Sequence, residues 1–332
     1  MIHVIGAGWY GCYIAKELSS LGQKVELWEQ ADAIFSGASS KNQNRLHLGF
    51  HYPRNFCTRK QSREGFEKFE TEFPELSTKI RNNVYAIASD SLLDASTYEH
   101  IFKYEEYLFE EFEPNFQNSR IEKFYRCEEK LIRHDLAKIY WENQGLSLNL
   151  GSPVVFEHGE LSVNGASISH SREDIYIDCT WGALNPVPNY REELFITFLV
   201  RRSVENSNFD ALTVMDGPFF SIFPYGDPRD KLFSLTHVKL GVVSTQVLSA
   251  SDLQVRYEAI LDDVTTLLPH FQDEFSLESM YISRKYKPES KSDSRVSAVS
   301  LNDRRRLITV LSGKIDTVFQ ARDQVIEAIK SL

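Results

Sequence analysis

The amino-terminal segment constrains the fold of this chain more than any other part of it. Residues Ile2 to Ile5 form a short apolar run that predicts a buried strand, and the pattern G-x-G-x-x-G follows at once over Gly6 to Gly11. Apolar residues then recur at helical spacing from Tyr10 to Leu21, and a second predicted strand over Lys24 to Trp28 ends in Glu29. This order of elements predicts a Rossmann-like α/β unit with a parallel sheet.

Each glycine of the turn has a physical role in binding a dinucleotide. Gly6 permits the tight turn, Gly8 lets the backbone approach a pyrophosphate, and Gly11 lets the helix pack closely on the strand. The phosphates rest on the N–H groups of the first helical turn, and Glu29, 18 residues after Gly11, accepts hydrogen bonds from ribose hydroxyls. This fingerprint fits both NAD and FAD. The predicted cofactor contacts of the unit are Gly6, Gly8, Trp9, Tyr10, Gly11, Glu29 and Gln30.

Composition excludes several classes of protein. The 332 residues carry 37 Lys and Arg against 47 Asp and Glu, and the formal charge of -10 argues against a nucleic-acid partner. No apolar run approaches the roughly 20 residues that cross a bilayer, so we expect no transmembrane segment. Four cysteines lie far apart without a CxxC pair, which predicts neither a metal site nor a disulfide framework. Reduced thiols, and a first strand that leaves no room for a leader, predict a cytoplasmic protein.

A resemblance to a known family begins in the polar run Ser36 to Asn44. This run, which follows an acid-terminated strand, resembles the GASS-x-N-type loop of the D-amino-acid-oxidase-like (DAO) superfamily of FAD-dependent oxidoreductases. The continuation to Pro53 is similar to the branch that contains L-2-hydroxyglutarate dehydrogenase. Asn42, His47, Gly49 and Tyr52 fall on the pattern of that branch, whereas His51 replaces its first aromatic residue and Asn44 replaces a glycine. The resemblance implies bound FAD, with Ser39, Ser40 and Asn42 among its contacts.

Two later segments resemble the same family. Ile175 to Asp178 and the following Cys179-Thr180-Trp181-Gly182 are similar to a strand and TG-type turn beneath the cofactor, although Trp181 interrupts the usual dipeptide. Arg306 to Val310 reads as a strand, and Ser312 to Thr317 resembles the turn whose backbone amides meet the flavin ring before the last helix. The resemblance therefore adds Thr180, Gly182, Gly313, Lys314, Ile315 and Asp316 to the expected cofactor contacts.

The remainder of the chain predicts a second, mainly β region. Residues 64–79, 92–112 and 133–145 have helical character, 114–119 is a turn-rich break, and short strands are expected over 153–178 around His158-Gly159. Four successive strands over Leu194–Arg201, Ala211–Met215, Phe219–Pro224 and Leu232–Val238 predict an antiparallel sheet. We therefore expect an α/β protein with a glutathione-reductase-type FAD-binding domain (1–80, 130–185 and 290–332) and an inserted antiparallel-sheet substrate domain (81–129 and 186–289).

The expected chemistry depends on how the protein manages one proton. Oxidation of an alcohol needs a base for the hydroxyl proton, whereas an amine that binds neutral needs none. If the segment is extended, Arg45 and His47 share one face, which predicts His47 as the base and Arg45 as an anion clamp. His51 is the second candidate base. The expected substrate contacts are Arg45, His47, Tyr225 and Arg284, the last resembling the family's carboxylate-binding arginine before a proline.

The leading hypothesis is an FAD-dependent oxidoreductase that oxidises a CH–OH carbon of a small polar substrate, a hydroxy acid or a sugar derivative. Two alternatives stay open: CH–NH oxidation of an amino acid or amine, and a non-catalytic protein that retains FAD or another nucleotide. Oxygen, a quinone and other carriers are all compatible with the sequence as electron acceptor.

Overall fold

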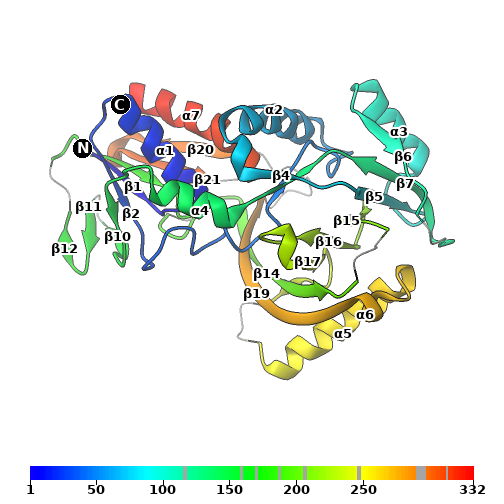
Figure 1. Ribbon diagram of the computed structural model, residues 1–332. Helices are drawn as coiled ribbons and strands as arrows, with labels where there is room; N and C mark the ends of the chain where they lie inside the picture. The colour runs from blue at the N-terminus through cyan, green and yellow to red at the C-terminus, as the bar shows by residue number, and fades with distance from the viewer. Residues whose placement is uncertain are drawn as a thin grey trace.

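Figure 1 shows the computed structural model, with the two termini close together at one side and a large curved sheet at the other. No helix in the part of the chain that the structure describes is long and apolar enough to cross a membrane. Of the expected turns, residues 115–117 of the 114–119 break, His158, Gly159 and Ser312 lie outside the described residues. The structure describes residues 1–114, 118–157, 160–168, 171–185, 188–204, 208–244, 248–288, 297–311 and 313–332.

A six-stranded sheet with the order β20-β21-β13-β1-β2-β9 contains both ends of the chain. β1 pairs in parallel with β2 on one side and with β13 on the other, so the predicted parallel α/β unit is confirmed. Only β20 runs antiparallel to its neighbour within this sheet as described. The strands are β1 (Ile2–Ile5), β2 (Val25–Trp28), β9 (Leu148–Asn149), β13 (Ile175–Asp178), β20 (Ala298–Asn302) and β21 (Leu307–Leu311).

Different layers cover the two faces of this sheet. Helices α1 (Trp9–Ser20) and α7 (Val318–Lys330) contact each other and cover one face. On the other face, Ile5 and Tyr176 pack with Leu161 of a small antiparallel sheet, which lies at the left in Figure 1. The small sheet consists of β10 (Val154–Glu157), β11 (Glu160–Val163) and β12 (Ala166–Ser167). These three layers bury both faces of the parallel strands, which explains why β1 is apolar throughout.

A nine-stranded sheet forms the second part of the molecule, with the order β18-β14-β17-β16-β15-β5-β7-β6 and β19 paired to β14. It is mainly antiparallel, as expected, but β15 and β5 pair in parallel. Helix α5 (Ala250–Leu267) packs its apolar face against the sheet, and α6 (Phe271–Glu274) follows it. The strands are β5 (Asn83–Ala88), β6 (Phe109–Glu111), β7 (Ile121–Cys127), β14 (Tyr190–Arg202), β15 (Ala211–Met215), β16 (Phe220–Pro224), β17 (Leu232–His237), β18 (Val242–Val243) and β19 (Phe275–Pro288).

Two predicted helices have different bounds in the structure. The helix expected at 64–79 is α2 (Phe56–Glu72), which begins after Asn55, whose side chain accepts a hydrogen bond from the Thr58 N–H. It ends before the 3₁₀ turn η1 (Pro74–Leu76), because proline cannot continue a helix, and β4 (Ser77–Lys79) follows. The helix expected at 92–112 is only α3 (Ala95–Tyr104), since β6 joins the sheet edge beside β7. Neither α5 nor β19 was expected from the sequence.

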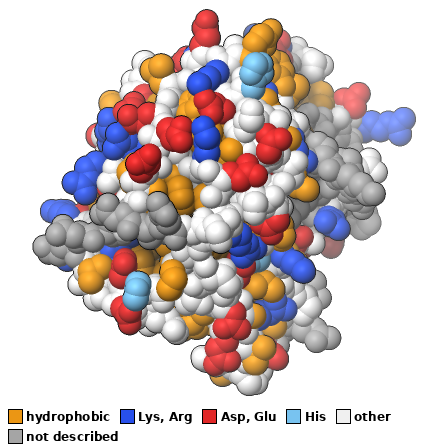
Figure 2. Space-filling view, turned by 90° about the vertical axis from the view of Figure 1, so that its right-hand side faces the viewer, with side chains coloured by type: hydrophobic (Ala, Val, Ile, Leu, Met, Phe, Trp, Pro, Cys, Tyr) orange, Lys and Arg blue, Asp and Glu red, His pale blue; other side chains and the backbone are white. Residues whose placement is uncertain are grey.

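A three-stranded sheet joins the two large sheets and carries the segment expected to face the substrate. Its order is β3-β8-β4, and β3 (Arg45–Leu46) follows the polar loop after Glu29. β8 (Lys130–Ile132) leads into α4 (His134–Glu142). The side of the molecule that lies at the right in Figure 1 has acidic and basic side chains interspersed (Figure 2). Interspersed charges of this kind are typical of a solvated surface.

Candidate active site

The glycine turn between β1 and α1 has the close backbone contacts that its motif predicts. A Cβ on Gly11 would lie 1.8 Å from the carbonyl oxygen of Gly6, so only glycine fits there. Gly6 itself has φ +97°, and a Cβ on it would lie 2.9 Å from the carbonyl oxygen of Cys179. Gly8 is the N-cap of α1 and has no side chain of its own, while Ser39 Oγ accepts the Trp9 N–H of the first turn. A helix N-terminus of this kind can serve as an anion cradle.

Two side chains border this cradle. Glu29 accepts hydrogen bonds from the N–H groups of Ala7 (2.8 Å) and Ala31 (3.0 Å), one on each carboxylate oxygen. Ser39 Oγ accepts from the Trp9 N–H at 2.9 Å and would lie 2.7 Å from a Cβ on Gly8. Each carboxylate oxygen of Glu29 has a second acceptor position, which leaves the predicted ribose contact open to it. That contact, and those of exposed Gln30 and of Ser40 and Asn42, stay predictions.

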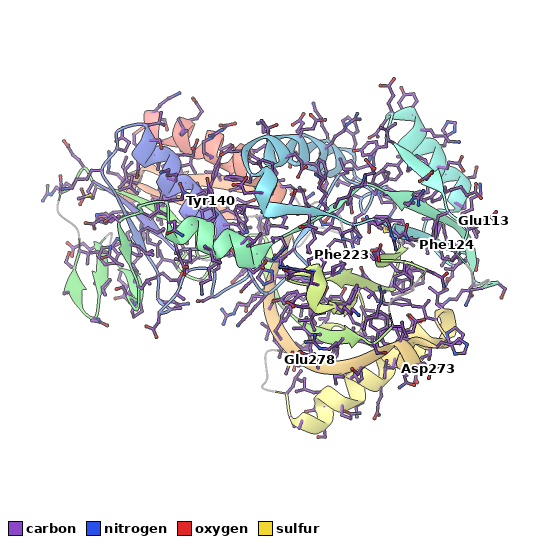
Figure 3. All side chains as sticks on the ribbon, in the orientation of Figure 1. Glu113, Phe124, Tyr140, Phe223, Asp273 and Glu278 are labelled. Carbon is purple, nitrogen blue, oxygen red and sulfur yellow. The ribbon has the colours of Figure 1, made fainter. Side chains whose placement is uncertain are left out.

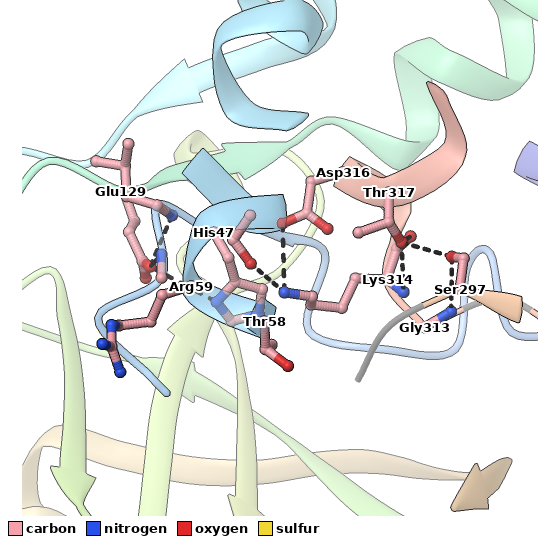
Figure 4. A network of polar contacts seen from close by, with 12 residues as sticks. His47, Thr58, Arg59, Glu129, Ser297, Gly313, Lys314, Asp316 and Thr317 are labelled. Carbon is pink, nitrogen blue, oxygen red and sulfur yellow. Dashed lines mark hydrogen bonds and ion pairs between the residues drawn. The ribbon is translucent and has the colours of Figure 1, made fainter. Parts of the chain in front are cut away.

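The turn between β21 and α7 is fastened to the first helix by buried hydroxyl groups. Tyr10 Oη contacts Ser297 Oγ (2.7 Å) and Thr317 Oγ1 (2.9 Å) and donates to the Lys314 carbonyl oxygen. Burial is the main reason why the pKa of Tyr10 is raised, so the phenol stays protonated. Ser297 Oγ also accepts from the Gly313 N–H at 3.2 Å (Figure 4). The C-terminal turn is thereby held beside the glycine turn, where both were expected to meet one cofactor.

A cavity of about 300 Å³ opens between these turns and the nine-stranded sheet. Its wall combines the first turn of α1, the 38–45 loop, the C-terminal turn and strands β14, β17 and β19. The described lining contains no Asp or Glu, although the chain carries a charge of -10, so the cavity attracts anions. The basic residues of the lining are Lys41, Arg45, Arg284, Lys285 and Lys314, and its histidines are His47 and His51.

His47 lies in the cavity wall and contacts a buried carboxylate behind it. Its side chain is 16% exposed, and its Nδ1 lies 3.6 Å from Oε1 of Glu129, which is fully buried. The ring centroids of His51 and Tyr52 lie 5.8 Å and 5.7 Å from that of His47 and 5.3 Å from each other. Both predicted bases therefore line one cavity, and His47 lies within ion-pair distance of the Glu129 carboxylate.

Lys314 and Asp316 lie on the other side of His47 (Figure 4). The Lys314 ammonium donates to Ser62 Oγ of α2, lies 3.9 Å from the Asp316 carboxylate, and stands 4.4 Å from the centre of the Tyr52 ring. Asp316 is buried, and burial raises its pKa despite the opposing effects of Lys314 and His47. Asp316 is not among the residues that line the cavity, and its expected flavin contact stays a prediction.

Arg45 has a different environment from that expected of an anion clamp. Its guanidinium donates to Tyr85 Oη (2.7 Å) and Thr213 Oγ1 (2.8 Å) and lies 3.5 Å from Glu129. It also stacks 4.2 Å from the centre of the Phe223 ring, which is labelled near the middle of the molecule in Figure 3. The side chain is only 2% exposed, and its positive charge is paired with the buried Glu129 carboxylate. The expected extended segment is correspondingly short, because β3 ends at Leu46.

The other two expected substrate contacts differ in position. Arg284 lies on the cavity wall, where its side chain is 61% exposed and its Nε lies 3.4 Å from Glu192. Tyr225 lies outside the described lining: its hydroxyl donates to the Ser40 carbonyl oxygen at 2.8 Å. Its ring packs on His134, with 4.8 Å between the centroids. Tyr225 thus supports the 38–44 loop, because its polar end is directed at that backbone and not at the cavity.

Beneath the predicted TG-type turn, Asp178 holds Thr180 through the Thr180 N–H (2.8 Å) and hydroxyl (2.6 Å). Trp181, which interrupts the family dipeptide, has φ +60° and lines the cavity beside Tyr286. Gly182 also has positive φ, and a Cβ on it would lie 3.2 Å from the Tyr286 ring. The turn is therefore tight at Gly182, and Trp181 is available to contact a bound molecule.

Sequence reasoning missed Glu129, which lies between β7 and β8. Tyr125, Cys127, Glu129 and Leu131 are buried, whereas Arg126, Glu128 and Lys130 are not. This alternation with period two was the available signal, since it places Glu129 on the buried face of the strand pair. This alternation was overlooked because Glu128 and Glu129 are adjacent, and two adjacent glutamates usually indicate a solvated turn.

Comparison with known proteins agrees with this site. The family model described as "DAO: FAD dependent oxidoreductase" matches residues 1–112. A relative from Fusarium mangiferae, "FAD-dependent monooxygenase FPY4", is 32% identical over 98% of this chain and 90% of its own length. Mitochondrial L-2-hydroxyglutarate dehydrogenase of Arabidopsis thaliana is 34% identical over 27% of this chain and 19% of its own. Glycine oxidase from Geobacillus kaustophilus shares the fold, with a TM-score of 0.74 at 13% identity over 99% of this chain and 94% of that one.

The chain belongs to the DAO family of FAD-dependent oxidoreductases. It is therefore an enzyme whose cofactor is FAD, and the hypothesis of a non-catalytic nucleotide-binding protein is not retained.

Proposed function

We propose that this enzyme oxidises the CH–OH carbon of a small polar substrate, a hydroxy acid or a sugar derivative, and that His47 accepts the hydroxyl proton. The observation that carries the proposal is the position of His47, which faces the cavity with one side of its ring and a buried carboxylate with the other. A neutral imidazole in this position can take a proton on the nitrogen that faces the cavity.

The residues around the cavity fit an FAD molecule. The first turn of α1 lines the cavity and begins at Gly8, which has no side chain, so a pyrophosphate could approach its N–H groups. We propose that Glu29 holds the adenosine ribose, that the Ser39 loop borders the diphosphate, and that the Gly313–Ile315 amides meet the flavin. Bound FAD supplies the acceptor for a hydride, which is two electrons and one proton from the substrate carbon.

The chain itself handles the second proton and the charge. As the substrate C–H bond breaks, its O–H proton passes to His47 and a C=O bond forms, so that the electrons and protons balance. Basic residues of the cavity, Lys285 and Arg284 on β19 among them, favour a substrate that carries a carboxylate or another anionic group. The cavity wall from β14 and β17 adds hydroxyl groups, Thr197 and Thr236, that can bind a polar chain.

Oxidation of a CH–NH bond is the alternative within the same chemistry. Its support is the shared fold of glycine oxidase, which at 13% identity concerns the fold alone. The name of the Fusarium relative adds a further outcome, a monooxygenase in which a separate reductant reduces the flavin before oxygen reacts. CH–OH oxidation differs from CH–NH oxidation in its need for a base that accepts the substrate proton. A monooxygenase differs from both because the electrons that reduce its flavin come from a separate reductant.

The test is anaerobic reduction of the enzyme-bound flavin by a panel of hydroxy acids, sugars, amino acids and nicotinamide nucleotides. We expect a hydroxy acid or sugar to bleach the flavin, and we expect His47→Ala to retain FAD but to be reduced roughly 100-fold more slowly. The rate in the parent enzyme should also fall at acid pH, because an imidazolium has no lone pair to accept a proton. His100→Ala, a matched change at an exposed position on α3, should leave the rate unchanged.

Three results would contradict the proposal. Ammonia released in step with bleaching would indicate an amine substrate. Reduction by a nicotinamide nucleotide alone, followed by incorporation of an oxygen atom into product, would indicate a monooxygenase. An undiminished rate in His47→Ala would remove His47 from the role of base.

A further inference from the structure

We infer that Glu129 is a positioning residue for His47: it holds the ring so that Nδ1 carries the proton and Nε2 stays free to accept one. This inference rests on the proposed function, since it concerns how the proposed base is prepared. Glu129 does not line the cavity and therefore acts through His47 and not on the substrate.

The first argument is the environment of the carboxylate. Glu129 is fully buried, yet it is surrounded by donors: the N–H groups of Leu48 (2.9 Å) and Gly49 (3.4 Å) on Oε1, and the Tyr85 hydroxyl (2.5 Å) on Oε2. Burial alone would raise the pKa of Glu129, but His47, Arg45 and Tyr85 outweigh it and lower the pKa to about 2. The carboxylate is consequently charged at every pH at which the enzyme would work.

The second argument is direction. Oε1 of Glu129 receives the two amides of the segment that carries His47 and faces His47 Nδ1 at 3.6 Å (Figure 4). This separation is an ion-pair contact and is longer than a hydrogen bond, and catalytic contacts are often this loose before substrate binds. A carboxylate only accepts hydrogen bonds, so a neutral His47 gains from presenting Nδ1–H to it. The tautomer with a free Nε2 is the one that a base requires.

The third argument is that the carboxylate is held from the opposite side. Tyr85 comes from β5, and Arg45, which lies 3.5 Å from Glu129, is itself fixed by Thr213 of β15 and Ser221 of β16. These strands belong to the nine-stranded sheet, whereas His47 follows the loop that borders the proposed FAD site. The network therefore ties the base to the same sheet whose strands β14, β17 and β19 line the cavity. This also explains why Arg45 is buried, since Glu129 needs a nearby positive charge.

Other charged and titratable groups also face His47, and the test must separate their effects from that of Glu129. They are His51 and Tyr52 in the adjacent loop, Lys314 and Asp316 in the C-terminal turn, and Arg45 on β3. Lys314 and Asp316 have opposite charges, so their effects on an imidazolium partly cancel. Glu129 is the carboxylate within ion-pair distance of the ring among the described residues.

The experiment is a double-mutant cycle with Glu129→Gln and His47→Ala, read out by anaerobic flavin reduction across pH. Glutamine keeps the shape and can still accept the backbone N–H groups, but it carries no charge to favour an imidazolium. We expect Glu129→Gln to retain FAD, to be reduced at least 10-fold more slowly, and to move the acid limb of the rate profile down by about one pH unit. In the His47→Ala background, Glu129→Gln should have no further effect on the rate.

A purely structural role of Glu129 gives a different pattern. It would slow the enzyme equally with and without His47, and it would leave the acid limb in place; either result overturns the inference while the function of His47 stands. A parental rate in His47→Ala overturns the proposed function itself. Glu128→Gln is the matched control, because the neighbouring Glu128 is 68% exposed and pairs with Lys79 at the surface.

A second variant protects the test against a folding failure. If Glu129→Gln loses FAD, Tyr85→Phe removes only the hydroxyl that donates to Oε2 and should still slow reduction several-fold, again only when His47 is present. The ring nitrogens of isotope-labelled histidine, followed by NMR without substrate, supply a readout that does not depend on turnover. We expect the Nδ1–H tautomer of His47 in the parent and a mixture in Glu129→Gln, whereas the same tautomer in both would refute the inference.

Discussion

Replacing Gly65 by alanine should destabilise this protein, although alanine is the better helix former. Gly65 lies within α2, where the same change on an open surface would stabilise by about 1 kcal/mol. Here a Cβ would lie 1.9 Å from the carbonyl oxygen of Asp316 and 2.7 Å from its carbonyl carbon. Since ordinary contacts of a Cβ begin at 3.4 Å, α2 and the turn η4 (Ile315–Thr317) would have to separate by about 1.5 Å.

The magnitude follows from the kind of atom that is contacted. The obstacle is backbone, which cannot rotate away as the end of a side chain can, so the cost lies near the upper part of the range for overpacking, about 3 kcal/mol. The helix propensity of alanine offsets about 1 kcal/mol of this, and we expect a net loss of about 2 kcal/mol. The separation would also move Ser62 of α2 away from the Lys314 ammonium, so FAD retention should weaken as well.

Urea denaturation of the holoprotein measures the stability, and titration of the apoprotein with FAD measures the retention. Gly37→Ala is the matched control, because a Cβ there meets nothing within 4 Å, and its stability should stay within about 0.5 kcal/mol of the parent. A Gly65→Ala protein as stable as the parent would refute the backbone-to-backbone contact of α2 with the C-terminal turn.

Two further predictions concern carboxylates. Glu29→Ala should weaken FAD binding by about 1 to 3 kcal/mol, because a charged hydrogen-bond acceptor is lost, and unchanged affinity in an equilibrium titration would show that Glu29 does not contact the ribose. Glu129 should stabilise the fold above about pH 4.5 and lose that contribution, about 3 kcal/mol, as the pH falls toward 2, because its pKa is lowered to about 2 on folding. Glu129→Gln should therefore lose less stability than the parent between pH 5 and 3, and equal losses in denaturation series at these pH values would contradict the assignment.

Sequence patterns within short segments predicted those elements of the fold that depend on interactions between residues close in sequence. The β1–α1–β2 unit depends on glycine geometry, helical spacing and the position of Glu29, all of which lie within one short segment. Four strands of the large sheet, β14 to β17, were predicted in the same way from apolar runs bounded by turn residues, whereas β5, β6, β7, β18 and β19 were not. The limits of α3 were wrong because β6 becomes a strand only through pairing with β7.

Some residues of the site could be predicted from the sequence, but the contacts between their side chains could not. The sequence by itself predicted a dinucleotide against the glycine turn, and it placed His47 and His51 just after the adjoining loop. Only the tertiary structure decided that Arg45, at the cavity wall, lies within 3.5 Å of Glu129, and that the backbone of Asp316 packs against Gly65. The physical reason is that a charge or a close contact depends on which groups surround it, and folding brings those groups together from distant strands and helices.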